Sequence, residues 1–117
     1  MPGFIVPHID AETALARTAA GETLFVDVRK PEAAKKSGAT LRGAMRRDPF
    51  SLGHDDPLTA VDRPLIVFCV HGHEVSQFAC ALLKMHGRDV RYVMGGFEAL
   101  KAAGAQTEPL RGADDDA

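Results

Sequence analysis

The sequence has few cysteines: Cys69 and Cys80 are the only two, and they do not form a CxxC pair. Structural zinc sites and disulfide-stabilised folds need more cysteines or a closer spacing. We therefore expect neither a structural disulfide nor a structural zinc site. A redox pair of Cys69 with Cys80 stays open as an alternative, because both lie in one expected strand-loop-helix segment.

Long apolar runs and a strong net charge are also missing. The longest apolar runs fall far short of the ~20 residues that span a bilayer, and residues 1–9 lack the regions of a signal peptide. The formal net charge of −2 gives no reason to expect nucleic acid or a membrane as a partner. No Gly-x-x-x-x-Gly-Lys phosphate loop is present, so nucleotide hydrolysis has no support. We expect a cytoplasmic protein.

The order of the expected elements predicts an α/β domain. With 117 residues, 45% of them hydrophobic, the chain suits one domain with one core. Strands alternating with helices favour a mostly parallel sheet covered by helices on both faces. The strands are expected at residues 4–6, 24–28, 41–45, 65–69 and 90–94, and the helices at 11–20, 31–36, 75–85 and 97–103.

The segment from Leu65 to Met85 carries the strongest candidate site. An uninterrupted apolar run ends at Cys69, Gly72 permits a tight turn, and apolar residues then recur at helical spacing from Val75. Such a run is typical of a strand buried on both faces. The loop after it would lie at the carboxyl edge of a parallel sheet, where α/β domains bind ligands. Loop amides and a helix amino terminus favour a thiolate there, which makes Cys69 a candidate nucleophile.

Several motifs in order resemble a rhodanese-type sulfurtransferase domain. Cys69-Val70-His71-Gly72 precedes a helix, and Gly95-Gly96-Phe97-Glu98-Ala99-Leu100 follows downstream. Asp27-Val28-Arg29-Lys30-Pro31-Glu32 resembles the segment after the family's second strand, and Gly38 with Gly43-Ala44 resembles its next turn. The resemblance spans roughly residues 5 to 105.

This resemblance implies a three-layer rhodanese-like α/β fold over residues 1–105. Because the following residues are small, polar and acidic, we expect residues 106–117 to form an acidic, disordered tail. It implies that Cys69 accepts a sulfane sulfur as a persulfide and passes it to a thiophilic acceptor. The donor would be a small sulfur-donor anion or a protein persulfide, and no cofactor is implied. The loop that would bind the substrate comprises Val70, His71, Gly72, His73, Glu74 and Val75.

The loop departs from the family pattern at Glu74, where many active rhodaneses have a basic residue. Related phosphatases and arsenate reductases close a slightly longer loop with an arginine that binds the oxyanion. No arginine occurs from Cys69 through Ser76, so phosphate and arsenate chemistry are disfavoured. Glu74 also supports an alternative reading, a non-catalytic rhodanese-like binding or regulatory module.

Other polar residues have simpler interpretations. His71, His73 and Glu74 are a weak signal for a metal site, because such sites need three or four converging ligands and the sequence shows no further ones; we expect no metal. Asp27 and Arg29 are expected to form a scaffold pair if Arg29 folds back. Cys80 is expected to pack in the core, and the basic residues at 42, 46 and 47 are expected to be solvated, with anion recognition as the alternative.

Overall fold

The computed structural model describes residues 7–48, 62–71 and 74–110. None of the helices in this part of the chain is long and apolar enough to cross a membrane. In chain order the elements are β1 (His8–Ile9), α1 (Ala11–Ala19), β2 (Leu24–Asp27), α2 (Pro31–Ser37), β3 (Ala39–Leu41), β4 (Met45–Arg46), β5 (Leu65–Phe68), α3 (Glu74–Met85), β6 (Val90–Val93), α4 (Gly96–Ala102) and β7 (Thr107–Pro109).

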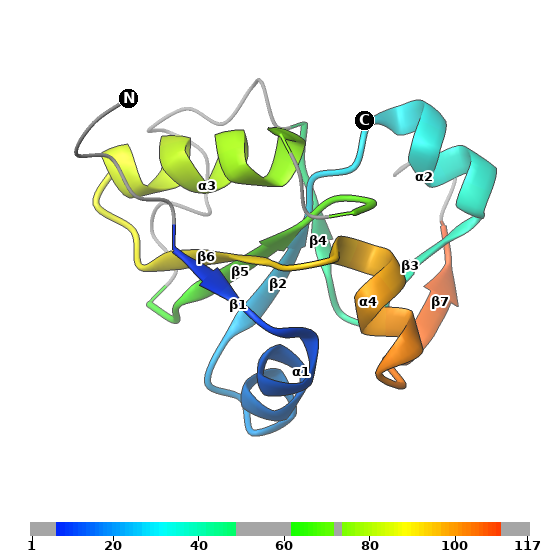
Figure 1. Ribbon diagram of the computed structural model, residues 1–117, viewed down its shortest axis with the longest axis horizontal. Helices are drawn as coiled ribbons and strands as arrows, with labels where there is room; N and C mark the ends of the chain where they lie inside the picture. The colour runs from blue at the N-terminus through cyan, green and yellow to red at the C-terminus, as the bar shows by residue number, and fades with distance from the viewer. Residues whose placement is uncertain (1–6, 49–61, 72–73, 111–117) are drawn as a thin grey trace.

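A five-stranded sheet in the order β1-β6-β5-β2-β4 forms the centre of the domain. Its strand pairings are parallel, with Val26 opposite Val67 and Val67 opposite Tyr92. Since β5 lies between β2 and β6, the loop after β5 leaves the middle of the sheet at its carboxyl edge (Figure 1). A separate antiparallel pair joins β3 to β7.

Helices cover both faces of this sheet, as expected from the sequence. Alternate residues of β5 face opposite sides: Leu65 and Val67 pack in one hydrophobic cluster with α3, while Ile66 and Phe68 pack in another with α1 and α4. Figure 1 shows α3 on one side of the sheet and α1 with α4 on the other. The predicted three-layer α/β fold is therefore confirmed.

Local signals in the sequence explain where the first two helices begin and end. Asp10 caps α1 by accepting a hydrogen bond from the Thr13 amide at 3.2 Å, and its hydrogen bonds with Thr13 lower the pKa of Asp10. Pro31 occupies the first turn of α2, where a missing amide hydrogen costs nothing. Gly38 ends α2 with a left-handed backbone, φ 74°.

The structure differs from the expected elements at β1 (His8–Ile9), where the sequence predicts no strand, and in two further places. Instead of one strand over residues 41–45, a turn at Gly43 (φ 80°) separates β3 from β4. Residues 107–109, which were assigned to the tail, form β7 against β3. The expected strand at 4–6 and the tail from residue 111 lie outside the described residues.

The buried carboxylate of Asp27 connects several elements at the carboxyl end of β2. Its oxygens accept hydrogen bonds from the backbone amide and guanidinium of Arg29, at 2.8 to 3.2 Å. Thr40 Oγ1 of β3 donates to Asp27 Oδ2 at 2.7 Å, and Arg46 Nη1 of β4 lies 3.3 Å from that oxygen. Arg29 also donates to the carbonyl of Ala39. One carboxylate thus holds the end of β2, the segment before α2, β3 and β4 together.

This network confirms one expectation and corrects another. Arg29 does fold back onto Asp27, and both side chains are buried. Arg46 is not a solvated surface residue, because its side chain is only 7% exposed and is paired with Asp27. The parallel pairing of β2 with β4 explains this, since it sets Arg46 directly opposite Asp27. Arg42 is exposed and donates to the side chain of Gln106 at 3.0 Å.

We expect Asp27→Asn to lower the free energy of unfolding by about 3 to 5 kcal/mol, because it leaves buried cations without a counter-charge. Glu98→Gln, which breaks the exposed Glu98–Lys101 pair (3.4 Å), should cost less than about 1 kcal/mol. Urea denaturation followed by circular dichroism measures both values. If both variants lost the same free energy of unfolding, Asp27 would not hold the elements at the end of β2 together as described.

Candidate active site

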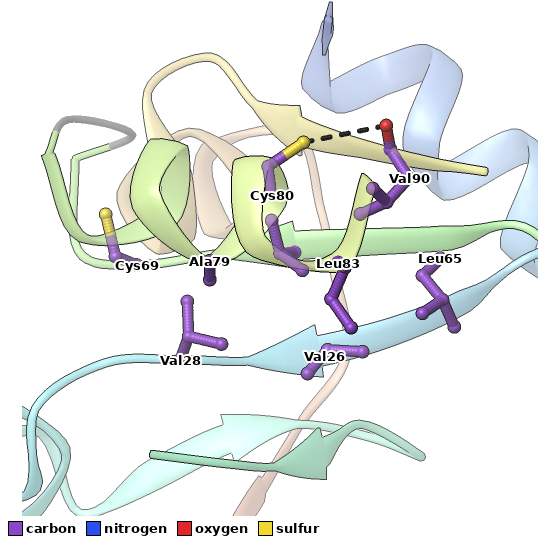
Figure 2. Packing of buried hydrophobic residues seen from close by; sticks show 9 residues of the cluster. Val26, Val28, Leu65, Cys69, Ala79, Cys80, Leu83 and Val90 are labelled. Atoms are coloured by element: carbon purple, nitrogen blue, oxygen red, sulfur yellow. Dashed lines mark hydrogen bonds between the residues drawn. The ribbon is translucent and has the colours of Figure 1, made fainter. Parts of the chain in front are cut away.

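Cys69 lies directly after β5, at the start of the central loop. It continues the alternation of that strand, so its side chain joins the cluster beneath α3 (Figure 2). The residue is 6% exposed and its thiol is free. The thiol donates a hydrogen bond to Ser76 Oγ at 3.3 Å. Because Ser76 is a buried residue in the first turn of α3, the sulfur lies at the positive end of that helix, which favours an anion.

The first turn of α4 anchors the backbone of the same loop. The Phe97 amide donates to the Cys69 carbonyl at 2.7 Å, and the Glu98 amide donates to the Val70 carbonyl at 3.2 Å. Gly95 allows the chain to turn into α4: its φ is 80°, and a Cβ there would lie 2.6 Å from the Cβ of Ala99. The amides of the turn that follows Gly95 therefore hold the backbone of Cys69 and Val70.

A cleft of about 450 Å³ opens beside Cys69. It contains several residues of the expected substrate loop, namely Val70, His71, Glu74 and Val75. Gly72 and His73 belong to the same expected set but lie outside the described residues. A cleft of this volume falls within the range of small-molecule sites. The structure thus gathers the described members of the predicted loop around one candidate nucleophile.

The segment between β2 and α2 also lines the cleft through Arg29 and Lys30, and α2 lines it through Ala33. We did not predict these residues, or Ser76, as members of the site. Arg29, Lys30 and Ala33 could have been predicted from the order of the strands. Because β2 and β5 are parallel neighbours, the segments that follow them lie at the same edge of the sheet. Ser76 had no comparable signal, because its hydrogen bond depends on how α3 packs over Cys69.

The charges around the cleft are balanced. The guanidinium of Arg29 donates to Asp27 and to the Ala39 carbonyl, and the residue is only 2% exposed. Lys30 and Glu74 are both exposed and bring opposite charges to the rim. Lys30 therefore offsets the negative charge that Glu74 adds to the loop, which the loop sequence alone could not indicate.

Cys80 packs in the hydrophobic core, as the helical pattern predicted. It is buried in α3, and its sulfur lies 3.5 Å from the carbonyl oxygen of Val90, to which it donates (Figure 2). Burial raises the pKa of the Cys80 thiol to about 12. Both cysteines are free. This environment disfavours the alternative in which Cys80 reacts with Cys69, because the thiolate is the reactive form.

In the part of the chain that the structure describes, no group of three or more His, Cys, Asp or Glu residues could hold a metal ion. Of the residues weighed as ligands, His71 and Glu74 line the cleft. His73 lies outside the described residues.

Comparison with known proteins decides the family. The model of the rhodanese-like domain matches residues 10–103, which include the whole loop and its anchoring helix. The chain belongs to the rhodanese-like family. The matched range contains Cys69, which lies between β5 and α3.

Solved structures agree with this rhodanese-like fold. A rhodanese-like domain from Anabaena is 26% identical, with a TM-score of 0.72 over 91% of this chain and 81% of that one. A protein from Bacillus halodurans is 20% identical, with a TM-score of 0.75 over 92% and 80%. A protein of unknown function from Rhodopseudomonas palustris, described as a possible tyrosine phosphatase, is 20% identical, with a TM-score of 0.74 over 92% and 99%.

We predict that iodoacetamide modifies Cys69 but not Cys80 in the native protein. With a pKa of about 12, only on the order of one Cys80 thiol in ten thousand is ionised at pH 8. Intact-mass analysis should show one label on the native wild-type protein and on Cys80→Ala, and two labels on the wild-type protein after denaturation. If iodoacetamide labelled Cys80 in the native protein as fast as it labels Cys69, Cys80 would not be the unreactive core residue described above.

Proposed function

We propose that this rhodanese-like protein is a sulfurtransferase that carries a sulfane sulfur on Cys69. The supporting observation is the position of the free thiol: it lines a cleft, it is hydrogen-bonded to the first turn of α3, and the backbone around it is fixed by α4. A nucleophile held in this way suits a covalent mechanism in two steps. No step requires a cofactor.

In the first step the Cys69 thiolate attacks the sulfane sulfur of the donor. A new sulfur–sulfur bond forms at Cys69, and the bond inside the donor breaks, so that the leaving group takes its electron pair. With thiosulfate the leaving group is sulfite; with a persulfide it is a thiolate. The hydroxyl of Ser76, 3.3 Å from the sulfur, can donate to the thiolate once the thiol proton has left.

In the second step a thiophilic acceptor attacks the outer sulfur of the Cys69 persulfide. The sulfur–sulfur bond to Cys69 breaks, and the enzyme recovers its thiolate while the acceptor leaves with the sulfur. The cleft is lined by apolar side chains, including Ala33, Val70 and Val75, beside the charged rim. The cleft, about 450 Å³ in volume, leaves room for an acceptor larger than a single atom.

Phosphatase chemistry, suggested for the Rhodopseudomonas palustris protein, has less support in this chain. Such enzymes clamp the oxyanion with a loop arginine, and positions 69–76 contain none. Arg29 cannot replace it easily, because its Nε and Nη2 donate to Asp27 and to the Ala39 carbonyl. The persulfide mechanism needs no such clamp.

The test of this function is sulfur loading. We expect the wild-type protein to gain one sulfur on Cys69 after incubation with thiosulfate or a small persulfide, and Cys69→Ser to gain none. Intact-mass and peptide analysis measure the gain. Circular dichroism should show that Cys69→Ser keeps its fold, so that loss of loading reflects the missing thiol.

Two results would contradict the mechanism. If Cys69→Ser still gained a sulfur, a residue other than Cys69 would carry it. A wild-type protein that takes up no sulfur from either donor would favour the alternative of a non-catalytic binding or regulatory module.

Glu74 should oppose anionic donors, because its carboxylate lies on the rim of the cleft. Two unit charges a few ångströms apart at an effective dielectric near 20 repel by about 3 kcal/mol, and by less when exposed to solvent. We therefore expect Glu74→Gln to raise kcat/KM for thiosulfate about three- to tenfold at low ionic strength. The gain should shrink as salt screens the charge.

Lys30→Gln is the matched control for this measurement, since Lys30 carries the opposite charge on the same rim. It should lower kcat/KM for thiosulfate under the same conditions. Steady-state assays at low and high salt compare the variants. An unchanged or lower value for Glu74→Gln at low salt would show that this carboxylate does not oppose the donor.

A further inference from the structure

The side of α3 that faces away from the sheet carries apolar residues, where a helix that covers a sheet usually presents polar ones. The buried residues of α3 face the sheet, namely Ser76, Ala79, Cys80 and Leu83. With about 3.6 residues per turn, positions 74, 78, 81 and 85 lie on the opposite side, which we call the outer face of α3. Phe78 is 46% exposed there, and Met85 is 74% exposed. Large exposed apolar side chains on one helix face indicate an interface.

Opposite charges lie at the two ends of this face. Glu74 is in the first turn of α3 and Lys84 in its last turn, and both side chains are exposed. Neither forms an ion pair within the described residues. They are ten residues apart on α3, which is about 15 Å along the helix axis, so they cannot pair with each other in one molecule.

The outer face is complementary to a second copy of itself. If two α3 helices pack antiparallel about a two-fold axis through the middle of the helix, Phe78 of each copy lies opposite Ala81 of the other. A large side chain then meets a small one twice, as a symmetric interface requires. Lys84 lies one residue, about 1.5 Å along the axis, from the level of Glu74 in the other copy. The charges that cannot pair within one molecule therefore meet between two molecules.

We propose that two copies of this chain associate through the outer faces of their α3 helices, and that Lys84 of the second copy pairs with Glu74. Because Glu74 lines the cleft beside Cys69, each copy then supplies a cation to the rim of the other's cleft. The association goes beyond the proposed function and does not depend on it. The effect of this cation on an anionic sulfur donor does rest on the proposed function.

The size of the face sets the expected strength of association. α3 has twelve residues and is about 18 Å long. One face of such a helix buries less area than a standard interface, so the dimer should be weak and reversible. Sedimentation velocity of the wild-type protein between about 10 μM and about 1 mM should show an equilibrium of monomer and dimer.

Met85→Asp tests the apolar part of the interface. Because Met85 is 74% exposed, this change should leave the fold intact, which circular dichroism checks. It should raise the dissociation constant of the dimer at least about tenfold, since it places a charge among apolar side chains. Met94→Asp is the matched control: Met94 is also an exposed apolar residue, at 52%, but it follows β6 and lies outside α3. It should leave the dissociation constant unchanged.

Charge reversal tests the antiparallel arrangement. Glu74→Lys and Lys84→Glu each bring like charges together at both ends of the interface, so each should raise the dissociation constant about tenfold. The double variant Glu74→Lys/Lys84→Glu restores opposite charges and should return the dissociation constant to within about threefold of the wild-type value. If the two single variants weaken the dimer and the double variant does not recover, the proposed pairing is wrong.

The contribution of Lys84 to the site is measured by the rate of sulfur loading from thiosulfate at protein concentrations where the dimer predominates. Lys84→Gln should lower this rate about twofold or more, and it should have no effect when Glu74→Gln is also present. Dimers that load sulfur at the same rate with and without Lys84 would overturn its contribution to the site.

The outcomes separate this inference from the proposed function. A wild-type protein that stays monomeric over the whole concentration range overturns the inference, even if it transfers sulfur. A dimer that Met85→Asp does not weaken overturns the assignment of the interface to α3. A protein that dimerises as described but takes up no sulfur contradicts the proposed function alone, because sedimentation measures the association without any transfer.

Discussion

The buried carboxylate of Asp27 is the interaction on which the functional end of this domain depends. It lies at the carboxyl end of β2 and accepts hydrogen bonds from Arg29, Thr40 and Arg46, so β2, β3 and β4 meet at one point. Arg29, fixed by Asp27, lies over the ring of Phe97 at 4.1 Å and forms part of the cleft beside Cys69. The scaffold pair therefore also shapes the site, although the guanidinium of Arg29 already donates to Asp27 and to the Ala39 carbonyl.

The loop after β5 is held from the opposite side by α4. Amides at the start of α4 bind the carbonyls of Cys69 and Val70, and Phe97 packs against both Phe68 and Arg29. The loop thus lies between a network centred on Asp27 and the first turn of α4, while Ser76 of α3 contacts the sulfur itself. Preorganisation of this kind suits a thiol that must act repeatedly as nucleophile and leaving group.

Much of this organisation can be predicted from the sequence, because local patterns specify it. The apolar run before Cys69 and the helical spacing after Val75 define the central unit, and that spacing also predicts that Cys80 packs in the core. Residues placed by long-range pairing could not be predicted. Arg46 looks like surface charge until β4 pairs with β2 and sets it opposite Asp27. β7 has no apolar alternation that would predict a strand, and it pairs with β3. Lys30 lines the cleft because β2, which precedes it, is the parallel neighbour of β5.

The central claim is that one sulfur atom passes through Cys69 from donor to acceptor. Its most direct test is a single-turnover chase: the protein is loaded from thiosulfate labelled with radioactive sulfur at the sulfane position, freed of donor by gel filtration, and mixed with an acceptor thiol. We predict that the label leaves Cys69 and appears on the acceptor at least as fast as steady-state turnover. Label that stays on the protein, or that leaves more slowly than turnover, would contradict the account.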